Sequence, residues 1–231
     1  LRSGNVWHVW ADKKGREWIL TDKGTTIYNH HFSTQLPFKW IREVGENICL
    51  ATPNGKLAVY DEKEHLVMIP MPAGVTRINQ LKNTGYQLLI ATNIGLVVYN
   101  PRTFKTEVIN VQSPGQPMAE VKNIYTDAYG MVWVFTDGMG VTMVNPRTGQ
   151  KAWLYADQPD PAERTTSEKF FITQDENKTL WVVPNGGTFS YFDRKAGKLV
   201  PYLLHSNSSG NFRVPNIKKF CLSDQGILWI S

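Results

Sequence analysis

One pattern of residues recurs along this chain, and it restricts the possible folds more than any other feature of the sequence. Its clearest copy, residues 121–149, contains in order an Asp-x-x-Gly segment, a Trp, a turn that starts with Thr136, and Asn-Pro-Arg-Thr-Gly. Aligned on the Trp position, copies occur at residues 18, 49, 89, 133, 181 and 229. The first two positions are 31 residues apart, and the later intervals are 40 to 48 residues. Intervals of roughly 40–50 residues are typical of four-stranded β-propeller blades.

Each copy consists of short apolar runs that favour strands. The runs are four to seven residues long, rich in Val, Ile, Tyr, Phe and Trp, and bounded by Gly, Asn, Asp or Pro. In the Asp-x-x-Gly segment, we expect Asp to cap a turn and Gly to supply the positive φ of a tight hairpin. The following Trp then fills the space between neighbouring blades. No stretch keeps a 3.6-residue period, so we expect a helix content close to zero.

The repeat predicts an all-β fold, a partial β-propeller of four-stranded antiparallel blades within a seven-bladed ring. Five blades and a truncated sixth are expected at about residues 5–37, 38–72, 75–112, 120–156, 168–204 and 215–231. The short first interval indicates trimmed connections rather than a missing strand. An open ring exposes unpaired strand edges, which natural proteins avoid. We therefore expect the chain to be the N-terminal part of a larger protein, or to close its edge with a second copy.

Composition and charge bound the expected partners. The 25 Lys and Arg residues exceed the 20 Asp and Glu residues, so the formal net charge is +5. These cations are spread along the chain, whereas nucleic-acid binders usually gather them on one stripe, so nucleic acid is not an expected partner. No apolar stretch approaches the roughly 18–20 residues of a membrane-spanning helix. We expect contact with a membrane only through segments outside this sequence.

Loops on one face of the predicted propeller carry the candidate binding residues. The Thr-containing turns and the connections between blades share this face, which has long loops at 112–120, 157–168 and 205–215. Loops on a rigid scaffold often bind ligands, and mixed carboxylate, guanidinium and aromatic groups suit a carbohydrate. The alternative is that these polar loops are only solvated. The candidate ligand-binding residues are Trp40, Asp137, Asp157, Asp160, Glu163, Arg164, Asn185, His205, Phe212 and Arg213.

Tryptophans divide into two groups. Those at the repeated position are interpreted as structural, because large aromatic side chains dominate core packing. They are Trp18, Trp133, Trp181 and Trp229. Outside this register, Trp40, Trp153 and Tyr155 are candidates for a stacking or protein-contact surface. Packing between blades is the favoured alternative for these three residues.

Cysteine and histidine patterns give no metal or cofactor site. Cys49 and Cys221 lie in apolar runs without a CxxC motif and are expected to be buried free thiols. No histidine has a metal-binding spacing, and His30 and His31 are expected on opposite sides of a strand. One carboxylate per Asp-x-x-Gly turn is far short of the six to eight oxygens that calcium takes. We therefore predict no metal and no cofactor.

Catalytic motifs are also missing from the sequence. Neither Gly-x-Ser-x-Gly nor a phosphate-binding Gly-rich loop occurs. Paired carboxylates within residues 157–163 could serve as an acid and a base, so a propeller enzyme acting on polysaccharide stays as an alternative.

The combination of Asp-x-x-Gly, Leu/Val-Trp-Ile/Val, Thr-x-x-Gly and Asn/Asp-Pro-x-Thr-Gly resembles the regulator-propeller repeat of hybrid two-component sensor histidine kinases. The likeness is good in the first, fourth, fifth and sixth copies. It is weak in the second and third, where Asp-x-x-Gly is replaced by Val44-Gly45-Glu46-Asn47 and by Asn83-Thr84-Gly85. The resemblance covers nearly the whole chain.

This resemblance implies a function for the chain. In the family, two seven-bladed propellers and a β-sandwich form a periplasmic region, and dimeric sensors respond to oligosaccharides. The chain itself has no kinase motif, dimerisation helix or receiver domain, so we expect it to be non-enzymatic. The partners so implied are an oligosaccharide, the remaining blades and domains of the same protein, and a second copy in a homodimer. The alternative is a scaffold propeller that binds other proteins.

Overall fold

The computed structural model describes residues 4–112, 115–136, 140–155, 170–184, 189–202, 204–205, 211–212, 220–223 and 227–230. In these ranges the chain forms strands joined by turns and contains no helix, which confirms the predicted all-β class. No helix able to span a membrane occurs among the described residues. The chain divides into two compact units, Leu1–Asn110 and Val111–Ser231, called unit 1 and unit 2.

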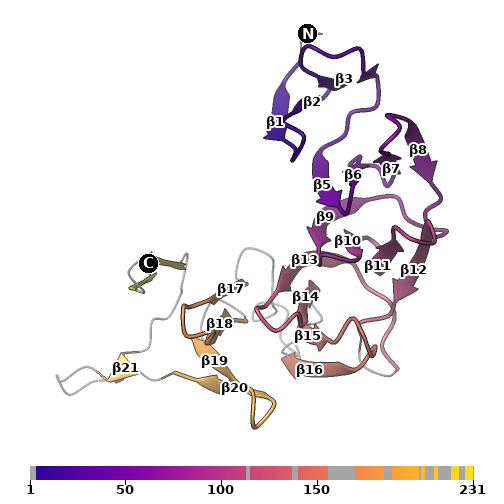
Figure 1. Cartoon of the computed structure of the whole chain (residues 1–231). Helices are drawn as coiled ribbons and strands as arrows, with labels where there is room; N and C mark the ends of the chain where they lie inside the picture. The colour runs from indigo at the N-terminus through magenta and orange to yellow at the C-terminus, as the bar shows by residue number, and fades with distance from the viewer. Residues whose placement is uncertain are drawn as a thin grey trace. The chain divides into compact units, whose positions relative to one another are not determined.

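Unit 1 contains three four-stranded antiparallel sheets, here called blades 1, 2 and 3, each a meander in chain order (Figure 1). Blade 1 consists of β1 (Val6–Ala11), β2 (Glu17–Thr21), β3 (Gly24–Ile27) and β4 (Ser33–Thr34). Blade 2 consists of β5 (Trp40–Val44), β6 (Asn47–Ala51), β7 (Leu57–Tyr60) and β8 (Leu66–Ile69). Blade 3 consists of β9 (Ile78–Asn83), β10 (Leu88–Thr92), β11 (Gly95–Asn100) and β12 (Lys105–Ile109). Blade 1 has all four strands although its repeat is short. The repeat can be short because its fourth strand, β4, has only two residues.

Unit 2 contains blades 4 and 5 and two smaller sheets. Blade 4 consists of β13 (Val121–Thr126), β14 (Val132–Thr136), β15 (Gly140–Val144) and β16 (Lys151–Tyr155). Blade 5 consists of β17 (Phe171–Gln174), β18 (Leu180–Val183), β19 (Ser190–Asp193) and β20 (Lys198–Pro201). The two-stranded sheets pair β21 (Leu204–His205) with β22 (Asn211–Phe212), and β23 (Phe220–Leu222) with β24 (Leu228–Ile230). That all these strands belong to one ring stays a prediction.

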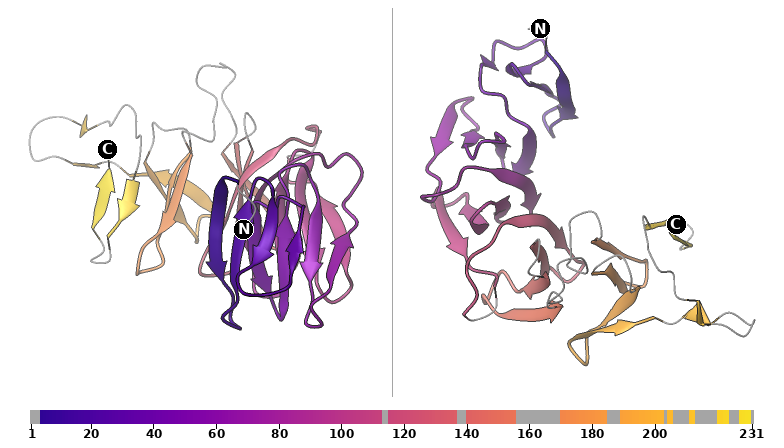
Figure 2. Two further views of the ribbon diagram at one scale, coloured as in Figure 1. Left: turned by 90° about the horizontal axis from the view of Figure 1, so that it is seen from above. Right: turned by 180° about the vertical axis from the view of Figure 1, so that it is seen from behind.

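Neighbouring blades are held together by apolar side chains that alternate along each strand. The sheets of unit 1 stand side by side in Figure 2. In β2, Trp18 and Leu20 are fully buried in a cluster that also contains Leu50 and Tyr60 of blade 2. A second cluster joins blades 2 and 3, and it includes Cys49. The core therefore lies between the sheets, as expected for stacked blades.

In blades 1, 4 and 5, an Asp in the turn between the first two strands ties the hairpin to the indole that follows it. In blade 1, Asp12 Oδ1 accepts the backbone N–H groups of Lys14 and Arg16, and Oδ2 accepts the Trp18 indole N–H at 3.0 Å. The φ of Gly15 is +77°, which confirms that this glycine supplies a positive φ, and Lys178 takes the equivalent position in blade 5 with a φ of +63°. The same carboxylate-to-indole bond recurs from Asp127 to Trp133 at 3.2 Å and from Asp175 to Trp181 at 3.0 Å.

Each Asp in these turns lies six residues before its Trp, a spacing that the sequence comparison did not use. In the last copy this spacing selects Ser223 rather than Asp224 as the equivalent of Asp12. Ser223 Oγ accepts the Ile227 N–H, and the Ser223 N–H donates to the Ile227 carbonyl. Ser223 therefore makes the turn contacts that Asp12 makes in blade 1.

The sheet of β23 and β24 corrects two predictions of burial. Trp229 is 62% exposed, whereas Trp18 and Trp133 are buried. Cys221, which pairs with Trp229 across the sheet, is an exposed free thiol, whereas Cys49 is a buried one as predicted. The reason is that an interior position needs a facing sheet, and no strand of the described residues covers these two side chains as blade 2 covers Trp18.

Two further predictions of local structure are wrong. His30 and His31 do not lie on opposite sides of a strand, because they belong to the turn between β3 and β4. Asn29 has a φ of +51° there, and the two imidazole rings lie 4.7 Å apart. Within 205–215, predicted as a loop, β21 and β22 pair antiparallel. The Ser-, Asn- and Gly-rich sequence 206–210 has the composition that connects hairpin strands.

Candidate functional site

Few of the sequence-predicted site residues can be placed by their side chains. Asp137, Asp157, Asp160, Glu163, Arg164, Asn185 and Arg213 lie outside the described residues. His205 lies on β21 and Phe212 on β22, at adjacent positions of the short hairpin. Trp40 is the candidate whose side chain is described. The binding role of all ten residues stays a prediction.

Trp40 begins β5 and lines a groove between blades 1 and 2. The groove has a volume of about 420 Å³ and is lined by residues 6–8 of β1 and residues 39–42 of β5 and the segment before it. We call it the β1–β5 groove. Both strands are edge strands of their sheets, so the peptide groups on one side of each have no strand partner in that sheet. The groove thus combines side chains with accessible backbone.

A β-bulge shapes the β1 side of this groove. The register between β1 and β2 shifts between Val6 and His8, so Trp7 is the extra residue. Its side chain is 39% exposed, although a Trp of this size gains most by burial. Bulges often redirect a side chain next to a functional site. Trp7 therefore offers an apolar ring surface at the edge of blade 1.

The β5 side of the groove carries an aromatic ring between two cations. Trp40 is half-buried and packs against the apolar cluster between blades 2 and 3, so packing accounts for part of its ring. Lys39 Nζ lies 5.2 Å from the centroid of the Trp40 ring, within cation–π range. The Arg42 guanidinium donates one hydrogen bond to the Ile41 carbonyl at 2.7 Å. Its remaining donors leave capacity for a ligand.

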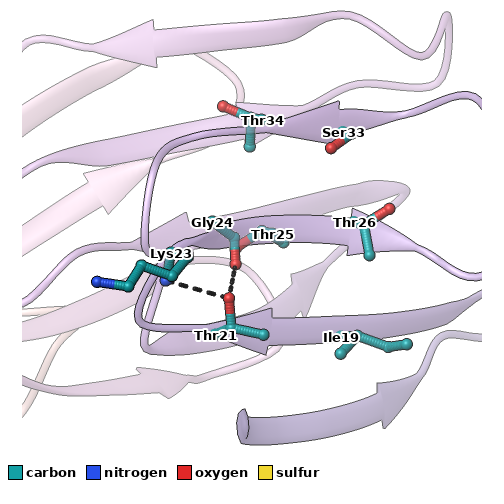
Figure 3. Close-up of a pocket in the computed structure, with 8 residues that line it drawn as sticks. All are labelled: Ile19, Thr21, Lys23, Gly24, Thr25, Thr26, Ser33 and Thr34. Atoms are coloured by element: carbon teal, nitrogen blue, oxygen red, sulfur yellow. Dashed lines mark hydrogen bonds between the residues drawn. The ribbon is translucent and has the colours of Figure 1, made fainter. Parts of the chain in front are cut away.

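A second hollow, on blade 1, is a poorer candidate. It has a volume of about 120 Å³ and lies between β2, β3 and β4 (Figure 3). Thr21 Oγ donates to the Gly24 carbonyl at 2.9 Å, and Thr26 Oγ donates to the Phe32 carbonyl at 3.0 Å. Thr34 Oγ accepts the Leu36 N–H. These hydroxyl groups already serve the turns of the blade.

A charged cluster at the other end of blades 1 and 2 is structural. Arg16 Nε donates to Asp12 Oδ2 at 2.7 Å, and the guanidinium lies 5.2 Å from the Tyr60 ring centroid and 3.7 Å from Glu64. Burial disfavours ionisation of Asp12, but hydrogen bonds from Trp18 and Arg16 and the charge of Arg16 outweigh it and lower the pKa of Asp12. These contacts hold the carboxylate ionised as an anchor between blades.

Metal binding finds no support in the described part of the chain, where no three His, Cys, Asp or Glu side chains gather. Two of the aromatic residues outside the repeated Trp position, Trp153 and Tyr155, lie on β16. Trp153 on β16 is 46% exposed and donates its indole N–H to the Val111 carbonyl. Tyr155 ends the same strand.

The sequence analysis missed Trp7, His8, Lys39 and Arg42 as groove residues. For Lys39 and Arg42, the signal was present, because a Trp at a strand start with cations on both sides is a local pattern. No local pattern marks Trp7 and His8, since the bulge depends on how β1 pairs with β2.

Comparison with solved structures identifies the architecture. The extracellular domain of BT4673 from B. thetaiotaomicron superposes with a TM-score of 0.65 at 19% identity, covering 98% of this chain and 31% of that one. The extracellular domain of BT3049 from the same organism, described as a hybrid two-component system, gives a TM-score of 0.57 at 12% identity over 100% of this chain and 39% of that one. A β-propeller domain, that of Cps50 (Swd1) from Myceliophteria thermophila, gives a TM-score of 0.55 at 14% identity over 87% of this chain and 73% of that one. The fold is a β-propeller.

The propeller is thus shared by proteins of different function at identities that establish the fold alone. Among them is a streptogramin B lyase, with a TM-score of 0.61 at 14% identity, covering 100% of this chain and 77% of that one. The chain spans about a third of the BT4673 extracellular domain. No protein-family model and no curated protein matches the chain.

Proposed function

We propose that this propeller is a ligand-sensing extracytoplasmic part of a hybrid two-component system. It either binds an oligosaccharide itself or transmits the binding of an oligosaccharide to a kinase in a longer chain. In this proposal the protein is periplasmic, the remaining blades and domains of the same chain are its partners, and the whole protein is a homodimer. The chain contributes binding rather than catalysis.

The observation that carries this proposal is the β1–β5 groove. It places two partly exposed indoles, Trp7 and Trp40, beside polar groups on the edges of two rigid sheets. Sugars present apolar ring faces for stacking and hydroxyl groups for hydrogen bonds, so such a mixture suits them. The likeness of the fold to extracellular domains described as hybrid two-component systems supports the sensor role.

Rigid blades also suit the transmission of a signal. A ligand shifts an equilibrium between two arrangements of propellers by its difference in affinity for them. Blades joined by buried aromatic and charged contacts, such as those of Asp12, Trp18 and Tyr60, move as units rather than deform.

Titration of the chain with oligosaccharides tests the proposal. We expect at least one glycan from an array to bind, and isothermal titration calorimetry to give a saturable signal of one site per chain. A chain that binds no glycan, but captures the same protein partner in the presence and absence of sugars, would instead support a scaffold propeller. Release of reducing ends or unsaturated uronates by the chain would contradict a purely sensory role.

A further inference from the structure

We propose that the β1–β5 groove selects acidic oligosaccharides, those that carry carboxylate or sulfate groups, over neutral ones. This inference rests on the proposed function and specifies its ligand. The groove is lined by His8, Lys39 and Arg42 and by no Asp or Glu. It therefore joins cationic donors to the indoles of Trp7 and Trp40.

The charge of the groove is uncompensated among the described residues. Neither Lys39 nor Arg42 has a carboxylate within ion-pair distance there. The neighbouring acid, Glu43, faces Lys13 Nζ at 3.8 Å. Arg42 uses one donor on the Ile41 carbonyl, and a guanidinium with free donors can bind a carboxylate or sulfate through two parallel hydrogen bonds.

The aromatic part of the groove explains why the ligand is a sugar rather than a simple anion. Trp7 is placed at the edge by the β-bulge, and Trp40 keeps part of its ring exposed on β5. An acidic sugar offers both an apolar ring face and an anionic group. A volume of about 420 Å³ lies within the range of small-ligand sites.

Single-stranded nucleic acid combines the same two chemistries, but the groove fits it less well. Nucleic-acid grooves track several successive phosphates with a continuous basic surface. The groove is lined by one Lys and one Arg, Lys39 and Arg42, and residues 6–8 add His8 as the only further basic residue. We therefore assign the groove to a short acidic glycan.

Calorimetric titration of the 231-residue chain tests the assignment. The probes are an oligogalacturonate, a sulfated heparin tetrasaccharide, a neutral cello-oligosaccharide of the same length, and a short single-stranded oligodeoxynucleotide. We expect one or both acidic glycans to bind at least about tenfold more tightly than the neutral one, with affinity falling as salt rises. The uronate and sulfate arms show which anion the groove prefers.

Matched variants locate the site. Arg42→Gln and Lys39→Gln should each weaken the acidic glycan about tenfold and leave a neutral glycan unchanged. Trp7→Ala, at an exposed ring, should weaken all glycans. Lys63→Gln removes an exposed cation outside the groove and should change nothing. Circular dichroism and thermal melting confirm that each variant is folded.

The outcomes separate this inference from the proposed function. Equal binding of neutral and acidic glycans, or loss of selectivity in Lys63→Gln but not in Arg42→Gln, overturns the acidic groove and leaves the glycan sensor standing. Binding of no glycan at all contradicts both. Tighter binding of the oligodeoxynucleotide than of either acidic glycan overturns the assignment in favour of nucleic acid.

Discussion

At the scale of single residues, the Asp12 carboxylate binds three kinds of group. Its Oδ1 atom fixes the backbone of the turn between β1 and β2, and Oδ2 accepts both the Trp18 indole and the Arg16 guanidinium. Asp127 makes the same bond to Trp133, but its arginine is Arg194, from the turn between β19 and β20. These two carboxylates thus each pair with one arginine, which two different sequence positions supply.

Replacement of Asp12 by Asn tests this role. We expect Asp12→Asn to lower the free energy of unfolding by about 2–3 kcal/mol at pH 7, because the amide cannot accept every donor and Arg16 loses the nearer of its two carboxylate partners. The matched control is Asp61→Asn. Asp61 caps a turn through Oδ1 in the same way, with bonds to Lys63 and His65, but holds no indole. The control should cost less than about 1 kcal/mol.

Lowering the pH should reduce the difference in the free energy of unfolding between the wild type and Asp12→Asn. The pKa of Asp12 is lowered in the folded protein, so its stabilisation is complete above the unfolded pKa of about 3.9 and is lost as the pH falls through the folded value. Urea denaturation at pH 7 and at successively lower pH measures both proteins. A difference that stays constant through this acid range would contradict an ionised Asp12 anchor.

At the scale of elements, Thr-containing turns hold the second hairpin of blades 1 and 3. Thr92 is fully buried, its hydroxyl donates to the Gly95 carbonyl at 2.8 Å, and it accepts the Ile94 N–H. Thr21 makes the corresponding bond to Gly24. The hydroxyl of the Thr side chain closes the turn, so a short connection is enough to join the two strands.

Substitution of this hydroxyl by a methyl group tests the element. Thr92→Val keeps the volume but leaves the Gly95 carbonyl and the Ile94 N–H without their partner, so we expect a loss of about 1–2 kcal/mol in the free energy of unfolding. Thr103→Val, at an exposed turn position, should change it by less than about 0.5 kcal/mol. Denaturation of both variants in urea measures the values, and equal effects would show that the buried hydroxyl has no special role.

At the scale of the molecule, an edge-on contact between a Trp and a second aromatic ring joins successive blades in each unit. Trp18 meets Tyr60 edge-on at 5.1 Å and 85°, and Trp133 meets Phe192 at 4.9 Å and 84°. In each case an Arg guanidinium lies over the second ring, at 5.2 Å for Arg16 and 5.6 Å for Arg194. The interface between blades is therefore repeated in three dimensions even where the sequence differs.

Two tryptophans at equivalent repeat positions test how much a facing blade contributes to the free energy of unfolding. Trp133→Leu removes a buried indole and its bond to Asp127, so we expect a loss of about 3–4 kcal/mol. Trp229→Leu, at the same repeat position but 62% exposed, should cost less than about 0.5 kcal/mol. Chemical denaturation followed by circular dichroism measures both. A large loss for Trp229→Leu would show that a surface covers this ring in solution.

The fold was predictable from the sequence because its repeat is local. The positions of Trp18, Trp133 and Trp181 and the alternation along short strands fix the blade type, and Thr or Asp with Gly fixes the turns. Blade 2 forms although its first turn lacks the Asp-x-x-Gly sequence. There, Val44 and Asn47 flank a two-residue hairpin loop in which Gly45 has a φ of +62°. Strand formation needs only the hydrophobic pattern and a residue that tolerates the turn.

The candidate site was much less predictable, for a physical reason. Trp40 could be selected from sequence, but the groove it lines also needs Trp7 and His8, whose position follows from a register shift between β1 and β2. The burial of Trp133 and the exposure of Trp229 likewise follow from whether a sheet faces them. Sequence alone determined the repeat, the strands and the turns, because these depend on residues near one another in the chain. Tertiary structure decided which residues are covered and which line the groove, because both depend on contacts between strands far apart in sequence.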